Sequence, residues 1–84
     1  VPNRMEPPRM STIDSYMDAA ERLYRTEFPD DAAPDTLLWV RNMAAGRADP
    51  DAPTLWPRDR AMMRAAETWV NTMWPRIEAA ARVA

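Results

Sequence analysis

From Met62 to Ala81, the apolar residues of this chain recur with the 3.6-residue period of an α-helix. The stripe consists of Met62, Met63, Ala66, Trp69, Val70, Met73, Trp74, Ile77, Ala80 and Ala81. It keeps its phase through Pro75 and leaves no residues over for a turn, so it predicts one long helix over about residues 57–82, kinked near Pro75. Such a helix needs other elements against its apolar face, because most helical stability in proteins comes from tertiary packing. The rest of the chain should therefore cover the stripe.

The first of two shorter helices is predicted over about residues 12–28. Ser11 and Asp14 resemble the capping box that opens a helix. Pro29 disfavours helical geometry at the residue before it, which should end the helix. The apolar side of this helix is formed by Ile13, Tyr16, Met17, Ala20, Leu23 and Tyr24.

A second helix is predicted over about residues 34–45. Pro34 suits a first helical turn, and Gly46 suits the left-handed residue that follows a last one. Its apolar residues cover a broad face, so it should be covered on more than one side. These residues are Leu37, Trp39, Val40, Met43 and Ala44.

The whole chain is thus predicted to be an all-α, three-helix small bundle. At 84 residues it is long enough for one domain, which we place at residues 11–84. Residues 1–10 contain three prolines and no apolar period, which predicts a disordered tail. Met10 is an alternative start to Val1.

The composition argues against catalysis and metal binding. The chain has no cysteine, histidine or lysine, so the usual activated nucleophiles and near-neutral bases are missing. The acids Asp30, Asp31 and Asp35, like Asp49 and Asp51, lack the glycine and the spaced oxygen ligands of a calcium loop. We therefore expect no enzyme activity, no catalytic residue, no metal and no cofactor.

No segment resembles a signal peptide or a membrane span, since the longest run of large apolar residues is only residues 37–40. The absence of cysteine also fits a reducing compartment. We expect a cytoplasmic protein without membrane contact.

Negative charge is concentrated in the first half of the chain, where residues 11–35 carry seven acids against two arginines. The hypothesis is that this surface docks on a basic surface of a larger protein or nucleic-acid-handling complex, as an inhibitor or adaptor. Its most specific form is a phage-type anti-defence or anti-CRISPR-like inhibitor, although no family motif is present. The alternative interpretation is a solvated face, supported by the i,i+4 order of Asp18 with Arg22 and Glu21 with Arg25. The candidate partner-binding acids are Asp14, Asp18, Glu21, Asp30 and Asp31.

Two tryptophans are further candidates for partner binding. WPRDRAMMRAA at residues 56–66 is echoed by WPRIEAAARVA at residues 74–84, by duplication or by coincidence. On one continuous helix, Trp56 and Trp74 would project from the same side about 27 Å apart. Tryptophan is enriched in binding hot spots, but tryptophan in a small chain also fills the core.

A second hypothesis uses the positive charges of the last helix. Arg58, Arg60, Arg64 and Arg82 would bind nucleic acid in a dimeric DNA-binding regulator or antitoxin. The net charge of −2 weighs against direct nucleic-acid binding. A third hypothesis is a structural subunit that forms a homodimer through the last helix.

Overall fold

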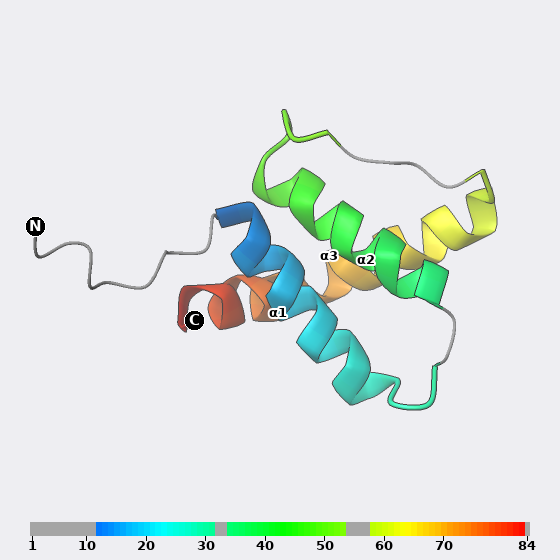
Figure 1. Ribbon diagram of the computed structural model, residues 1–84, viewed down its shortest axis with the longest axis horizontal. Helices are drawn as coiled ribbons and strands as arrows, with labels where there is room; N and C mark the ends of the chain where they lie inside the picture. Colours follow the sequence, from blue (N-terminus) through cyan, green and yellow to red (C-terminus); the bar gives the residue numbers. More distant parts are fainter. Residues whose placement is uncertain (1–11, 32–33, 54–57, 84) are drawn as a thin grey trace, which may run out of the picture.

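The computed structural model describes residues 12–31, 34–53 and 58–83, and three α-helices form most of this part of the chain (Figure 1). The helices are α1 (Thr12–Glu27), α2 (Pro34–Ala48) and α3 (Arg60–Val83). No strand occurs among the described residues, so the predicted all-α, three-helix class is confirmed. The predicted tail, Ser11, Trp56 and Pro57 lie outside the described residues.

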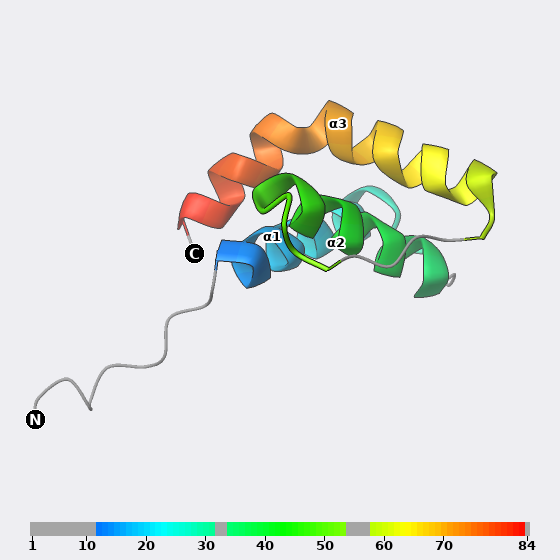
Figure 2. The same ribbon diagram turned by 90° about the horizontal axis from the view of Figure 1, so that it is seen from above.

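The helices form two layers. α1 and α2 run antiparallel as a hairpin, and α3 lies across both of them (Figure 2). Two ring contacts set the direction of α3 relative to α1. Tyr24, late in α1, meets Trp69 with ring centroids 5.3 Å apart, and Tyr16, early in α1, stacks on Trp74 at 5.0 Å. α1 and α3 are therefore antiparallel, and the start of α1 lies beside the end of α3.

α1 ends one residue before the predicted position, in a turn that two backbone hydrogen bonds close. The amide of Phe28 donates to the Tyr24 carbonyl over 2.8 Å, and the amide of Asp31 donates to the Phe28 carbonyl over 3.2 Å. Pro29 has no amide hydrogen to continue the helical ladder. The turn leaves the Phe28 side chain 41% exposed directly after the helix.

α2 is longer than predicted, because Gly46 does not cap it. Gly46 has no positive φ, and the helix continues through it to Ala48. The amide of Asp49 still donates to the Ala45 carbonyl over 2.9 Å. Pro50 then disfavours helical geometry at Asp49. The helix thus ends two residues before the proline, and the interpretation of Gly46 as a left-handed cap is wrong.

α3 begins at Arg60, three residues later than predicted, because Asp59 supplies the cap. The Asp59 Oδ1 atom accepts from the amides of Ala61 at 2.8 Å and Met62 at 3.3 Å, which satisfies donors at the open helix end. The predicted spacing of Trp56 and Trp74 stays a prediction, because Trp56 lies outside the described residues.

α3 runs without interruption through Pro75. The prediction that the apolar stripe belongs to a single helix is therefore confirmed. In Figure 2 the helix arches over the hairpin, and its C-terminal turns approach the start of α1. A kink centred on Pro75 stays a prediction.

The centre of the bundle is built largely from small residues. The largest fully buried side chains are those of Ile77, Val40 and Val70. Among the described residues, the buried alanines are Ala19, Ala20, Ala44, Ala45, Ala66 and Ala81. Alanine lets helices approach closely but buries little apolar area, so larger, partly buried side chains complete the core around it. These include Trp39, Trp69, Trp74, Met63 and Met73.

Candidate functional site

A small apolar cavity opens where the three helices meet, and we call it the three-helix notch. Its volume is about 150 Å³. Three aromatic residues, Tyr24, Phe28 and Trp69, line one part of it. The remaining lining residues are Thr36, Val40, Ala65 and Ala66. Every helix contributes to this lining, so the notch exists only in the folded bundle.

The aromatic residues of the notch hold one another in place. The Tyr24 and Trp69 rings meet edge to face with an interplanar angle of 80°, and the Phe28 ring lies 4.9 Å from Tyr24. The Trp69 Nε1–H group donates to Glu27 Oε2 over 2.9 Å. The Tyr24 hydroxyl donates to Asp31 Oδ2. Both polar groups of the aromatic lining are thus bound by carboxylates, which leaves mainly hydrocarbon in the wall.

Tyr24 is the one residue of the notch with a shifted ionisation equilibrium. Burial, reinforced by the hydrogen bond to the Asp31 carboxylate, raises the pKa of Tyr24 from 10.0 to about 12. The tyrosine is therefore neutral at physiological pH and remains a hydrogen-bond donor.

Four exposed acids of the hairpin are hydrogen-bonded to residues that line the notch or lie within two positions of them in the sequence, and we call these acids the acidic rim. They are Glu27, Asp30, Asp31 and Asp35. Glu27 and Asp31 accept hydrogen bonds from lining residues, Asp30 follows Phe28 by two positions, and Asp35 directly precedes Thr36. In α3, Arg64 is exposed and directly precedes Ala65 in the sequence. The notch therefore combines an apolar floor with a negative border along the hairpin.

The predicted acids of α1 are partly engaged within the protein. Asp18 pairs with Arg22 at 3.3 Å. Glu21 pairs with Arg25 at 3.1 Å and also with Arg41 of α2 at 3.6 Å. The two i,i+4 pairs agree with the sequence pattern, whereas the Glu21–Arg41 pair links two helices. Glu21 thus contributes to holding the hairpin together.

Asp14 is exposed in the first turn of α1, whereas Asp30 and Asp31 follow the end of this helix at Glu27. The thirteen helical steps from Asp14 to Glu27 span about 20 Å. The predicted acidic surface therefore separates into the α1 acids and the acidic rim, and only the rim adjoins an apolar cavity.

Trp74 takes part in a contact among all three helices. Its ring stacks on Tyr16 of α1 with an interplanar angle of 11°, and the Arg47 guanidinium of α2 lies over the same ring, 4.9 Å from its centre. Arg47 also donates to the Asn71 Oδ1 atom. Trp74 is half-buried in this arrangement, so it packs the bundle, and its partner-binding role stays untested.

The arginines of the nucleic-acid hypothesis do not form one patch. Arg58, Arg60 and Arg64 are exposed near the start of α3. Arg82 lies at the other end, eighteen residues and about 27 Å of helix beyond Arg64. There it pairs with Glu78 at 3.8 Å. A basic patch on one molecule would thus contain the first three arginines alone.

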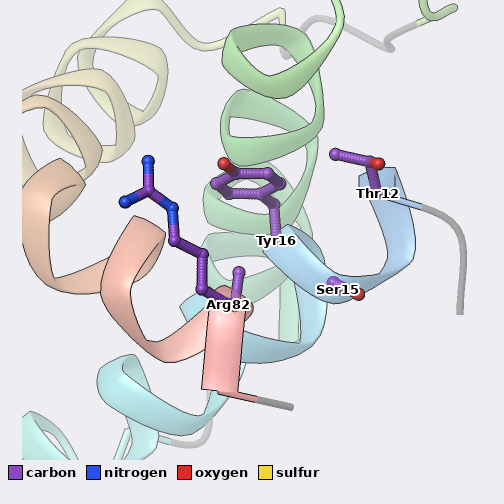
Figure 3. A pocket seen from close by; sticks show the side chains of 5 residues that line it. Thr12, Ser15, Tyr16 and Arg82 are labelled. Atoms are coloured by element: carbon purple, nitrogen blue, oxygen red, sulfur yellow. The ribbon is translucent and has the colours of Figure 1, made fainter.

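A second cavity, of about 200 Å³, lies between the start of α1 and the end of α3. It is lined by Thr12, Ser15, Tyr16, Ala81 and Arg82, and Figure 3 shows Tyr16 projecting from α1 between Thr12 and Arg82. Hydroxyl groups and a guanidinium could donate hydrogen bonds to an anion. However, the Arg82 side chain is largely exposed and already paired with Glu78, so this polar cavity is the weaker candidate.

No group of three or more potential metal-ligating side chains gathers in the part of the molecule that the structure describes. None of the helices that the structure describes is long and apolar enough to cross a membrane.

Comparison with known proteins gives no assignment: no family model matches the chain, and no curated protein or solved structure matches it.

Proposed function

We propose that this chain acts by binding a larger protein with a basic surface, as an inhibitor or adaptor, and performs no catalysis. The observation that carries the proposal is the position of the acidic rim beside the three-helix notch. Exposed carboxylates and an exposed apolar cavity on the same part of the surface are the two ingredients of a specific protein interface.

The two ingredients would have different tasks. The acids of the rim attract a basic partner over several ångströms and favour it over acidic proteins. The notch and the exposed Phe28 ring supply apolar area that loses water on contact. The charges thus determine which partner approaches, and the notch contributes to how long it stays.

A basic surface of this kind occurs on proteins that handle nucleic acid. The most specific form of the proposal is therefore a phage-type anti-defence or anti-CRISPR-like inhibitor that competes with nucleic acid. The proposed place of action is the cytoplasm, in keeping with a chain that has no cysteine.

The test begins with affinity capture from the native host, followed by titration of the purified partner with single charge reversals. Asp30→Arg should slow association about tenfold at low salt, and the difference should shrink as salt is added. The matched control is Asp51→Arg, which reverses an exposed acid in the connection between α2 and α3. Equal affinities for wild type and both variants would show that the acidic rim serves solubility alone.

The α1 acids are tested separately with Asp14→Arg and Asp18→Arg. Glu21 is unsuitable for reversal because it would then repel both Arg25 and Arg41. Circular dichroism of each variant checks that the helices are intact.

A second candidate function is a dimeric DNA-binding regulator or antitoxin. It is favoured by one observation, that Arg58, Arg60 and Arg64 are exposed together and form no ion pair with another described residue. It predicts a salt-sensitive gel shift that Arg60→Ala with Arg64→Ala abolishes. Absence of any shift at low salt eliminates this candidate, and light scattering tests the dimer.

A further inference from the structure

We propose that the three-helix notch receives one apolar side chain, of leucine or methionine size, from a partner segment that carries arginine or lysine beside it. The inference rests on the proposed function and names the chemistry of the partner at this site. It adds a specific anchoring position to what would otherwise be a purely electrostatic contact.

The size of the notch fits a single side chain. An apolar cavity of about 150 Å³ is large enough to hold a benzene molecule, and the notch has the same volume. A leucine or methionine side chain is of similar bulk, whereas a longer apolar segment would not enter. The alanines Ala65 and Ala66 keep this space open, because larger residues at their positions would fill it.

The chemistry of the wall favours a hydrocarbon group. The Tyr24 hydroxyl and the Trp69 indole N–H are bound by Asp31 and Glu27. Thr36 is the one other lining residue with a polar side chain. An entering polar group would lose its water without gaining equivalent hydrogen bonds, which costs free energy.

The acidic rim determines the charge of the occupant. Asp30 and Asp35 are exposed, and Glu27 keeps Oε1 available while Oε2 accepts from Trp69. A guanidinium on the same partner segment can form charge-assisted hydrogen bonds with these carboxylates. Nucleic acid would be repelled by the rim, so a basic polypeptide is the favoured occupant.

The probe is the peptide acetyl-Arg-Arg-Leu-Arg-Arg-amide, titrated into the full isotope-labelled chain at low salt and followed by NMR. The backbone amides of Thr36, Ala65 and Ala66 should shift most. The same peptide with alanine in place of leucine should bind at least about fivefold more weakly, because the alanine side chain buries less apolar area than the leucine side chain. The peptide with glutamate in place of arginine should not bind.

Variants of α3 localise the effect. Ala65→Met places a larger side chain in the notch and should weaken binding of the leucine peptide at least about fivefold. Ala79→Met is the matched control, because Ala79 is also an exposed alanine of α3 but lies about 21 Å along the helix from Ala65. This variant should bind like the wild type.

The outcomes separate this inference from the proposed function. Failure of the leucine peptide to bind, or equal binding of the leucine and alanine peptides, overturns the notch as an anchoring site. In the second case the electrostatic proposal survives if Asp30→Arg still weakens binding. The proposed function is contradicted if binding requires leucine but is not weakened by Asp30→Arg or by glutamate in place of the peptide's arginines. In the absence of peptide, the same amides could shift as the protein concentration is raised. That result would identify a second copy of the chain as the occupant and overturn the inference.

Discussion

Tyr24 belongs both to the core and to the wall of the three-helix notch. Its side chain is 7% exposed, its ring contacts Phe28 and Trp69, and its hydroxyl donates to Asp31. A hydroxyl in this position must remain protonated for the hydrogen bond to a carboxylate to exist. The packing of the notch is therefore coupled to the protonation of one phenol.

Stability should fall at alkaline pH because of this residue. The pKa of Tyr24 is about 12 in the folded chain and 10.0 ordinarily. The unfolded chain thus loses the proton first, so the stabilisation is complete below pH 10 and is lost as the pH rises toward 12. The slope in this window is at most about 1.4 kcal/mol per pH unit. Urea unfolding of wild type and Tyr24→Phe at several pH values measures it, and identical pH profiles would contradict the assignment.

At the residue scale, local contacts were predictable and contacts between helices were not. The ion pairs of Asp18 with Arg22 and Glu21 with Arg25 follow from helical spacing alone. The pair of Glu21 with Arg41 depends on how α1 meets α2, which no spacing reveals.

The residues of the notch illustrate the same limit. Tyr24 and Trp69 lie on the predicted apolar stripes. Phe28 lies at the end of α1, and its exposure results from the turn at Pro29. The sequence feature that points to this site is an aromatic residue directly before a proline and two acids. That feature does not indicate which residues of α2 and α3 line the notch with Phe28.

At the scale of the helices, their number and order followed from the sequence, whereas two helix ends did not. The Asp59 carboxylate determines the start of α3, and Pro50 determines the end of α2. Gly46 consequently lies inside a helix, where glycine has no conformational advantage.

Gly46→Ala should therefore stabilise the protein by about 0.5–1 kcal/mol, since alanine loses less conformational freedom in a helix. Thermal unfolding followed by circular dichroism measures the change. A glycine in a left-handed cap would give the opposite sign, so destabilisation by the alanine would contradict the helical assignment of this position.

Asp59→Ala should destabilise the protein by about 0.5–2 kcal/mol, because the amides of Ala61 and Met62 would lose their acceptor. Asp59→Asn retains an oxygen acceptor and should recover most of the loss. Denaturant unfolding compares the three proteins. An alanine variant as stable as the wild type would show that water caps the helix equally well.

At the scale of the whole molecule, stability depends on few large side chains. Domains of this length have small margins of stability. Ile77, Val40 and Val70 are the largest side chains that are fully buried, and alanines fill much of the remaining centre. The three helices therefore share a narrow core, and losses at its centre cannot be compensated elsewhere.

Ile77→Ala should destabilise the bundle by about 2–5 kcal/mol, through lost burial and the cavity that remains. Because this equals much of the stability expected for a chain of 84 residues, the variant should be largely unfolded at 37 °C. The control is Leu38→Ala, which shortens a side chain that is 41% exposed and should cost far less. Similar melting temperatures for the two variants would contradict the proposed core.

The alanine-rich interior also bears on how this chain can vary over evolutionary time. Where Ala19, Ala20 and Ala44 lie completely buried between helices, even one additional methyl group has nowhere to go. Charged residues on the outside have no such restriction. Descendants of this chain could thus change the charged residues that contact a partner while they retain the buried alanines. Common ancestry would then remain detectable at the alanine positions after the surface acids had diverged.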